Sequence, residues 1–468
     1  MKTFEEHLSQ VLREVADGVT PGAGLDDRVW AGLVRPHPAS RRPLVVASAA
    51  AVALVMAAVL VTRPWGGHGI PLQTLGGDSL AGAGPDTWNP LAKAPVQARN
   101  QFLEVWTGAA MLAWGGYAEQ GNLGDGAAFD PAAGSWSALP ASPLRPTVAP
   151  IGAWTGSEFL VFGTPNSDGP EPSSSPGAAY NPASRTWRSL KAFPLGGVAD
   201  SGSYAVWTGS RLLVWGFFGN DSANSERGTL DTRAAEFDPA SNTWTETSAA
   251  PVAAPIFGDA FWTGTQLLVF GQMGTSGSSA GTPQLVSYTP SSDTWQVLPD
   301  PPGPIAGGGA AAWTGTELIV GGGPAGAAAA AFSPSSGTWR TLPDAPEPFT
   351  GNDRYGDLWT GRDVLILADG DAQGRPLLFD PATNQWSFGA ASPVPGRMDG
   401  PAVWDGTAAL VWGGGTSQPM QVSSTPATLE VVPTPGASPV PTTVPAGTPE
   451  GTECCTTVEQ GYAYTPPE

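Results

Sequence analysis

The sequence has few of the residues that bind metals or form disulfides: two cysteines and three histidines among 468 residues. The cysteines are neighbours, Cys454 and Cys455, so they cannot build a disulfide framework or a CxxC-type metal site. Three roles remain for them: a strained vicinal disulfide, a crosslink to another chain, or ordinary loop thiols. The sequence favours a local pair or plain thiols, and we predict no metal or organic cofactor.

Charge is also scarce, and basic charge most of all. Only 13% of residues are charged, and 21 Lys and Arg against 41 Asp and Glu leave a net charge of −20. Residues 1–62 hold six of each sign, so the whole net charge falls on residues 63–468. We therefore predict no nucleic-acid partner, because such a ligand needs a basic surface. The acidity serves solubility or a site for cations or basic ligands, and solubility is the simpler interpretation.

Low charge disfavours long surface helices, and the abundant residues indicate a different architecture. The chain contains 62 Gly, 49 Pro and 19 Trp, which is typical of many short strands joined by tight turns. A chain of 468 residues can form two or three ordinary domains or one large closed β structure. The composition favours the closed β structure.

One long hydrophobic run is present, "LVVASAAAVALVMAAVLVT" at residues 44–62. Its 19 uncharged residues are about the number needed to cross a hydrocarbon core of roughly 30 Å as a helix. Arg35, Arg41 and Arg42 precede the run and only Arg63 closely follows, which predicts that the N-terminus stays inside. Because 43 residues come first, an uncleaved anchor is favoured over a signal peptide. We predict a single-pass protein of the cell membrane, with its bulk on the extracytoplasmic side.

The segments flanking this run differ in character. In residues 1–43, "FEEHLSQVLREV" places Phe4, Leu8 and Leu12 on one helical face. This cytoplasmic helical segment either docks a cytoplasmic protein or is a juxtamembrane helix without a partner, and the pattern does not choose. Residues 63–85 are rich in glycine and lack periodicity, as a linker does.

From residue 86 onward the sequence repeats. The first marker is Trp-Thr-Gly, with one Trp-Asp-Gly variant, at Trp106, Trp154, Trp207, Trp262, Trp313, Trp359 and Trp404. The second marker is aromatic-x-Pro at Phe129, Tyr180, Phe237, Tyr288, Phe332 and Phe379. A tryptophan follows each of these aromatic residues seven positions later, at Trp136, Trp187, Trp244, Trp295, Trp339 and Trp386. Fixed spacing of this kind indicates a repeat architecture.

Each repeat divides into four short apolar runs separated by turn signals. In the fourth repeat these runs are "APIFGDAFW", "QLLVFG", "PQLVSY" and "TWQVLP". A turn ending in glycine between apolar runs indicates a hairpin, and four antiparallel strands per repeat describe a propeller blade. Residues 86–468 resemble kelch repeats of the bacterial Trp-Thr-Gly variety. The resemblance implies an all-β, seven-bladed propeller, while its relatives include binders, scaffolds and a few enzymes.

The last repeat is split between the two ends of the chain. Tyr464 begins an aromatic-x-Pro marker, but the chain stops before a tryptophan follows it. Trp88 lies 18 residues before Trp106, and its counterparts lie 18 or 20 residues before the next marker. No aromatic-x-Pro precedes Trp88. We therefore predict that an N-terminal strand containing Trp88 closes the last blade, which removes the exposed sheet edges of an open array.

Loop length varies on one face only. The second strand of each repeat ends about nine residues after the tryptophan of Trp-Thr-Gly or Trp-Asp-Gly. From that ninth position to the next aromatic-x-Pro, the seven repeats have 14, 17, 21, 17, 10, 11 and 51 residues. In an antiparallel blade these loops lie on the same face of the propeller as the connections between blades. This face is a candidate binding surface. Alternatively, the loop lengths vary without selection. The longest insertion, residues 416–458 in the last blade, is rich in Pro, Thr and Ser, which predicts a disordered or extended segment.

First strands line the channel of such propellers, so polar residues at their starts are candidates for ligand binding at its mouth. These residues are Arg99, Asn100, Gln101, Asp200, Ser201, Asp259, Asn352, Asp353, Arg354, Arg397 and Asp399. Opposite charges converging on one opening can clamp a polar ligand. Alternatively, the channel is filled with water and the charges pair with one another.

Enzymatic function is disfavoured. The copper-dependent sugar oxidases of this architecture need histidine ligands, but His7, His37 and His68 all precede the repeats. "SPSSGTW" at 333–339 resembles a sialidase box but has Ser335 in place of the aspartate. We predict a membrane-anchored module that binds an extracytoplasmic ligand, glycan or protein. The alternatives are a transmembrane regulator, similar in layout to membrane-bound anti-sigma factors, and an envelope enzyme using channel carboxylates.

Overall fold

The computed structural model describes residues 84–163, 175–196, 198–218, 233–252, 254–255, 257–273, 282–305, 309–322, 326–349, 357–367, 374–394, 397–398, 401–416 and 456–467. The predicted cytoplasmic segment and membrane anchor, the predicted linker up to residue 83, and Cys454 and Cys455 lie outside these residues. Within the described ranges, no helix has the length and apolar character needed to span a membrane. The helical content of the same ranges is a single 3₁₀ turn, η1 (Pro290–Ser292).

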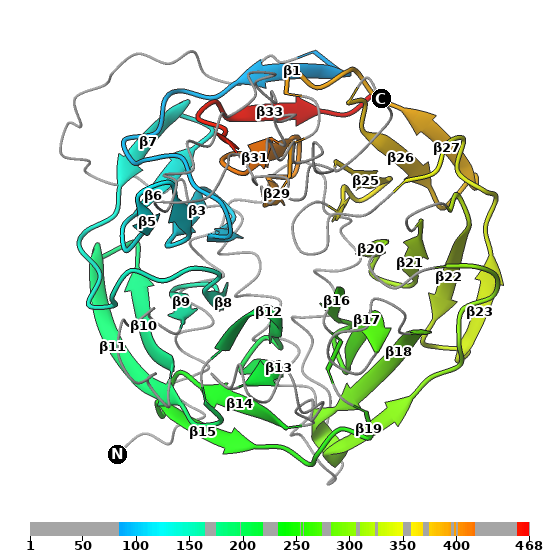
Figure 1. Cartoon of the computed structure of the whole chain (residues 1–468), viewed down its shortest axis with the longest axis horizontal. Helices are drawn as coiled ribbons and strands as arrows, with labels where there is room; N and C mark the ends of the chain where they lie inside the picture. Colours follow the sequence, from blue (N-terminus) through cyan, green and yellow to red (C-terminus); the bar gives the residue numbers. More distant parts are fainter. Residues whose placement is uncertain are drawn as a thin grey trace, which may run out of the picture. The chain divides into compact units, whose positions relative to one another are not determined.

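Seven four-stranded antiparallel sheets form a β-propeller, with the first strand of each blade innermost (Figure 1). Blade 1 contains β2 (Leu103–Trp106), β3 (Met111–Trp114), β6 (Gly126–Asp130) and β7 (Ser135–Ala138). Blade 2 contains β8 (Ile151–Trp154), β9 (Phe159–Phe162), β10 (Ser175–Asn181) and β11 (Thr186–Phe193). Blade 3 contains β12 (Val198–Trp207), β13 (Leu212–Phe218), β14 (Ala234–Asp238) and β15 (Thr243–Glu246). Blade 4 contains β16 (Phe257–Trp262), β17 (Leu267–Met273), β18 (Thr282–Thr289) and β19 (Thr294–Val297).

The remaining blades follow the same order, and two small sheets are added to them. Blade 5 contains β20 (Ala310–Trp313), β21 (Leu318–Gly321), β22 (Ala329–Ser333) and β23 (Thr338–Thr341). Blade 6 contains β24 (Asp357–Trp359), β25 (Val364–Ile366), β26 (Leu377–Asp380) and β27 (Gln385–Phe388). Blade 7 contains β29 (Ala402–Trp404), β30 (Ala409–Val411), β33 (Tyr462–Thr465) and β1 (Thr87–Pro90). The small sheets are the hairpin β4 (Tyr117–Ala118) with β5 (Gly121–Asn122), and the trio β28 (Arg397–Met398), β31 (Gly415–Thr416) and β32 (Thr456–Thr457).

The predicted closure of the ring is confirmed. Strand β1 pairs antiparallel with β33, and Trp88 lies opposite Tyr464. Their rings are 4.7 Å apart between centroids. Both ends of the propeller therefore belong to one sheet, as Figure 1 shows at β1 and β33. Noncovalent contacts alone close the ring at this joint.

The Trp-Thr-Gly marker forms the hairpin turn between the first two strands of each blade. In blade 1 the hydroxyl of Thr107 accepts a hydrogen bond from the backbone N–H of Ala110 at 2.9 Å. In the Trp-Asp-Gly variant, a carboxylate oxygen of Asp405 accepts the equivalent bond from Ala408 at 2.7 Å. All seven marker glycines adopt positive φ angles, between 89° and 102°. Glycine suits these positions because they strain residues that carry a Cβ.

The fourth-strand tryptophans join each blade to the preceding one. In all seven blades the indole N–H donates to a backbone carbonyl of the preceding blade or the segment after it, at 2.7 to 3.0 Å. Each of these rings also lies 4.6 to 5.1 Å from the aromatic residue of its own aromatic-x-Pro marker. The aromatic residue of aromatic-x-Pro and the fourth-strand tryptophan, seven residues apart in six blades, thus form one contact between the third and fourth strands. The tryptophan also links its blade to the preceding one.

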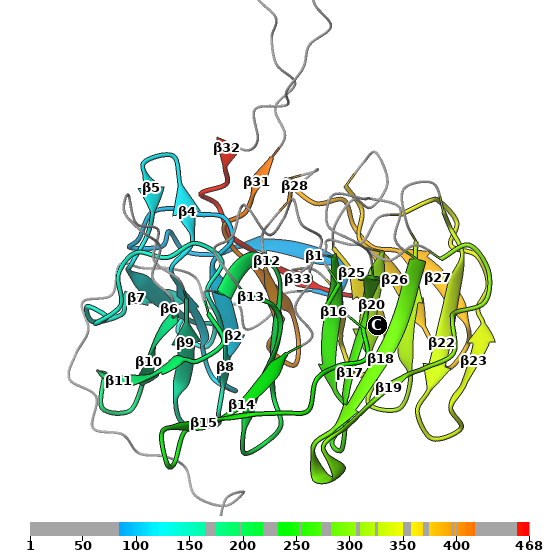
Figure 2. The ribbon, with the colours of Figure 1, turned by 60° about the horizontal axis from the view of Figure 1, so that its bottom comes forward.

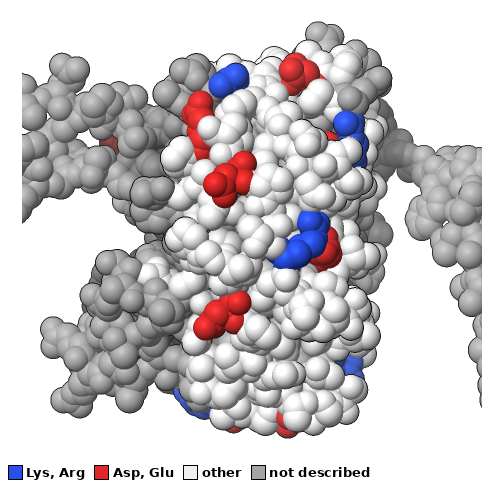
Figure 3. Space-filling model, turned by 90° about the vertical axis from the view of Figure 1, so that its right-hand side faces the viewer, with Lys and Arg blue, Asp and Glu red and all other residues white. Residues whose placement is uncertain are grey.

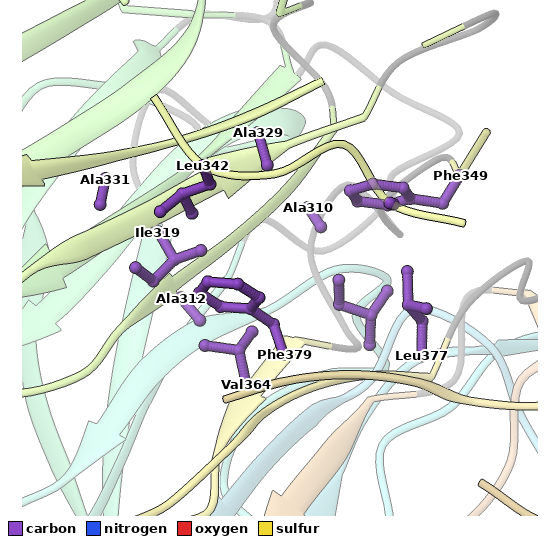
Figure 4. Packing of buried hydrophobic residues seen from close by; sticks show 12 residues of the cluster. Ala310, Ala312, Ile319, Ala329, Ala331, Leu342, Phe349, Val364, Leu377 and Phe379 are labelled. Atoms are coloured by element: carbon purple, nitrogen blue, oxygen red, sulfur yellow. The ribbon is translucent and has the colours of Figure 1, made fainter. Parts of the chain in front are cut away.

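Hydrophobic clusters fill the spaces between blades. Between blades 5 and 6, side chains from both sheets face one another, including Ile319 from the first and Val364 and Phe379 from the second (Figure 4). Near the end of the second strand, five blades have an aromatic residue and blade 6 has Leu367, but blade 5 has Gly321. Phe349, from the connection to blade 6, occupies this space and lies 5.6 Å from the ring of Trp386.

Candidate binding surface

The face that carries the variable loops also carries the two added sheets. Because the strands of each blade run antiparallel, loops between second and third strands emerge on the same face as the connections between blades. Figure 2 shows the β4–β5 hairpin of blade 1 and the β28–β31–β32 sheet of blade 7 on that face. Blades 1 and 7 are the two neighbours at the closure of the ring.

Backbone hydrogen bonds fix the β4–β5 hairpin on both sides. Asn100 and Tyr117 exchange two bonds of 2.8 Å, which adds the connection before β2 to the hairpin as a third strand. Gly116 donates to Thr147 at 2.8 Å and accepts from Leu123 at 2.8 Å. A Cβ on Gly116 would lie 2.6 Å from the carbonyl oxygen of Asn100, so this close approach requires glycine. The hairpin is therefore held in one position on blade 1.

Arg99 lies beneath this hairpin, with its side chain fully buried. Its guanidinium donates to the carbonyl oxygens of Gln97 at 2.8 Å, Gly115 at 3.0 Å and Asp125 at 3.0 Å. It also forms an ion pair of 2.9 Å with the carboxylate of Asp125, which is itself more than half exposed. Burial lowers the pKa of Arg99, and the hydrogen bond and charge of Asp125 oppose that shift. Arg99 thus ties the start of blade 1 to both ends of the loop that carries the hairpin.

The backbone of Arg99 connects the hairpin to blade 7. Its carbonyl oxygen accepts a hydrogen bond of 2.9 Å from Gly414, and the carbonyl of Gly414 accepts one of 2.9 Å from Val458. The guanidinium carbon lies 5.8 Å from the ring centroid of Trp412. A Cβ on Gly413 would lie 2.6 Å from the Arg99 carbonyl oxygen, so the two segments are in close contact. Both ends of the predicted insertion at 416–458 are therefore held at this point, through β31 and β32.

We refer to residues 97–101, 117–123, 414–416 and 456–458 together as the blade 1–7 platform. Three of the predicted ligand-binding residues, Arg99, Asn100 and Gln101, belong to it. The structure differs from the sequence prediction in one respect: Arg99 is inside the joint between blades instead of facing a channel mouth. Its long side chain can satisfy several carbonyl groups at once, which explains why a charged residue is buried there.

Of the other predicted ligand-binding residues, Arg397 lies opposite the platform residue Thr416 in the pairing of β28 with β31. Asp259 is half-buried on β16 of blade 4, opposite Phe270 in the register. Asp200 lies on β12 and Arg397 on β28, and the structure does not describe their side chains. Asp353, Arg354 and Asp399 lie outside the described residues.

One inner-strand carboxylate, that of Asp357, forms a contact between blades. Asp357 on β24 of blade 6 accepts a hydrogen bond of 2.8 Å from the backbone N–H of Ala311 in blade 5. Glu104 occupies the equivalent position on β2, two residues before the marker tryptophan. Over the part of the chain that the structure describes, no three His, Cys, Asp or Glu residues gather into a possible metal site.

Sequence reasoning missed the platform residues Tyr117, Gln120 and Asn122, as well as Asp125, which pairs with Arg99. The available signal was the pair Gly115-Gly116 directly after an apolar strand, where both residues adopt positive φ angles of 75° and 92°. Such a pair permits the sharp reversal that starts a hairpin. The side of the ring shown in Figure 3, which faces right in Figure 1, carries scattered charges of both signs on a largely uncharged surface.

Comparison with known proteins identifies no family. No family model matches the chain, and no curated protein matches it. Among solved structures, YjhT is similar with 17% identity and a TM-score of 0.45, over 64% of this chain and 99% of that one.

Proposed function

We propose that the protein is a membrane-anchored, extracytoplasmic propeller of the kelch type that binds a ligand through the blade 1–7 platform. The observation that supports this most is the way the platform is held. A hairpin and a three-stranded sheet from the two blades at the closure are joined through Arg99, by side-chain bonds on one side and a backbone bond on the other. Fixed loops on a rigid scaffold are suited to binding, because little conformational entropy is lost when the ligand binds.

The composition of the platform also fits recognition better than catalysis. Gln97, Gln120 and Asn122 supply amide donors and acceptors, and Tyr117 supplies an exposed aromatic ring. Such residues provide contact area and hydrogen bonds without a nucleophile or a base. Arg99, the basic residue of these segments, is already bonded to protein atoms. We propose no catalytic step.

A second candidate, the transmembrane regulator, is favoured by one observation. Strand β1 is the first strand of the propeller and also the strand that closes it. The connection that follows β1 reaches Arg99 over residues 91–98, of which Leu91, Ala94 and Ala98 are buried. A change at the platform would therefore act on the strand that continues toward the N-terminal segment, where residues 1–43 would hold a cytoplasmic protein.

Binding of the full-length protein to isolated cell envelopes of its source organism tests the proposed function. In one variant, residues 117–122 are replaced by six Gly and Ser residues. In the control, residues 131–134 of the same blade, which form the turn between β6 and β7 on the opposite face, are replaced in the same way. We expect the first variant to lose binding while keeping its folded spectrum, and the control to bind as the unmodified protein does. Equal binding by all three proteins would refute the role of the platform.

A further inference from the structure

The hairpin brings three side chains together on one face. Asn100 pairs with Tyr117, and Tyr117 pairs with Asn122 across the hairpin. Residues directly opposite one another on antiparallel strands project to the same side of the sheet. Tyr117 therefore lies between two asparagine side chains. The whole group spans roughly 10 Å, which is two strand spacings.

The central residue of this group is unusually exposed. Tyr117 is 45% exposed, one of two large hydrophobic side chains that stand out in this way among the described residues. The other, Val297 at 41%, lies on the outer strand of blade 4. An exposed ring held on a hairpin with a fixed backbone offers a flat apolar surface next to polar groups.

The two asparagines have unfilled hydrogen-bonding capacity. Asn100 is only 7% exposed, and its Oδ1 has no hydrogen-bond partner. The Nδ2 of Asn122 is buried and also lacks a partner. Buried polar groups are nearly always paired in folded proteins, so unpaired ones indicate a missing bonding partner. Here one acceptor and one donor lack partners on either side of the same exposed ring.

From this arrangement we infer that Tyr117, Asn100 and Asn122 form a binding subsite for a neutral, hydroxyl-rich ligand, a glycan without charged groups. The inference rests on the proposed function and names the ligand class of the same platform. A hydroxyl group both donates and accepts, so neighbouring hydroxyls of one sugar can satisfy an acceptor and a donor together. The C–H face of the sugar ring would pack on Tyr117.

Charge and size both favour this class. In the connection before β2 and the loop that carries the hairpin, the basic residue Arg99 is buried and hydrogen-bonded, while Glu119 and Asp125 are exposed. Such a surface does not attract an anion. A group spanning roughly 10 Å matches one or two sugar rings, whereas a stable protein interface buries about 800 Å² on each partner.

Binding requires a small side-chain movement. The unpaired amide atoms are shielded from solvent in the ligand-free protein, so the ligand must insert beside the Tyr117 ring or displace it. Exposed side chains change rotamer on the picosecond to nanosecond scale, so this movement does not limit binding.

Saturation-transfer NMR and calorimetry of the full-length protein in detergent test the inference. The probes are maltohexaose, cellohexaose and mannohexaose, with hexagalacturonate as an anionic comparison and an uncharged ten-residue peptide as a protein-like one. We expect at least one neutral hexasaccharide to bind and hexagalacturonate not to bind. Tyr117→Ala should weaken that binding at least tenfold, Tyr117→Phe by less than threefold, and Asn100→Asp, which replaces the amide by a charge, at least fivefold. The matched control Val297→Ala should change nothing.

Three outcomes would overturn the inference: no neutral hexasaccharide binds, the peptide alone binds, or Tyr117→Ala binds as the unmodified protein does. In the first two cases, loss of envelope binding on replacing residues 117–122 would still support the proposed function with another ligand class. Failure of that replacement to affect envelope binding would instead refute the platform itself.

Discussion

Replacing Trp88 with alanine should destabilise the whole propeller, not only its N-terminal end. The substitution removes the hydrogen bond from the indole Nε1 to Ala390 at 2.9 Å and the ring contacts with Tyr464 at 4.7 Å and Tyr462 at 6.4 Å. Loss of a buried tryptophan typically costs 3–5 kcal/mol, and Trp88 is only half-buried. We therefore expect the free energy of unfolding to fall by about 3 kcal/mol.

The matched control is Trp386→Ala in blade 6. Trp386 makes the same bond, to Pro343 at 2.9 Å, and the same ring contact, with Phe379 at 4.6 Å. Its strand follows the third strand through a short turn, whereas β1 reaches β33 only around the ring. The closing contact between Asp86 and Tyr464 spans 378 positions, against five for the equivalent Tyr288 and Asp293. Chain-closure entropy makes that longer span less favourable by about 4 kcal/mol, so β1 is the strand that would detach first if its contacts did not hold it.

Urea unfolding followed by tryptophan fluorescence and by far-ultraviolet circular dichroism measures both variants. We expect similar losses of stability in the two proteins, with coincident transitions by both probes. If Trp88→Ala left the global transition unchanged and only increased hydrogen exchange in residues 462–465, β1 would be a peripheral strand and the closure argument would be wrong.

Three further predictions concern the joint, the pH dependence and the turns. Arg99→Met should lower the free energy of unfolding in urea by about 3 kcal/mol, because several carbonyl groups lose their donor. The control Arg188→Met, which breaks a partly exposed ion pair, should lower it by less than about 1 kcal/mol. Burial first, and then the hydrogen bond to Asp86, raise the pKa of Tyr464, so its contribution to stability is complete below the usual tyrosine pKa of about 10 and declines as pH rises above it. Stability measured at pH 8 and pH 10.5 should therefore fall less in Tyr464→Phe than in the unmodified protein, and an equal fall would contradict this assignment. Gly264→Ala, at a φ of 100°, should lower the melting temperature by an amount equivalent to about 1–2 kcal/mol, and an unchanged melting temperature would show that the turn relaxes.

The number of blades and their closure could be predicted because the residues responsible recur at fixed spacing. A tryptophan that must reach a carbonyl of the preceding blade cannot shift along its strand without losing that bond. Tyr464 and Trp88 were therefore recognisable as two halves of one blade, although 376 positions separate them in the sequence.

A third recurring position was overlooked. The residue two positions before each fourth-strand tryptophan adopts a positive φ, from 49° to 68°. It is glycine, asparagine or aspartate in six blades and Arg185 in the remaining one. These residue types tolerate the left-handed conformation, and their shared identity was visible in the sequence. The position includes Asp86, which accepts hydrogen bonds from Tyr464 and Ala390 across the closure.

The platform could not be predicted in the same way. The β4–β5 hairpin occurs in one blade, so no repetition marks it. Arg99 was assigned to a channel mouth because it lies at the start of a first strand, and first strands line the channel of such propellers. Its burial depends on three carbonyl groups, of Gln97, Gly115 and Asp125, which only the folded loop brings together.

Photo-crosslinking from two positions of blade 1 tests the central claim most directly. A diazirine-bearing residue replaces Gln120, exposed on the platform, or Ala133, exposed in the turn on the opposite face, in the full-length protein in its own cells. We expect a crosslinked product from position 120 that is absent or much weaker from position 133. Equal products from both positions, or a product from position 133 alone, would contradict binding through the blade 1–7 platform.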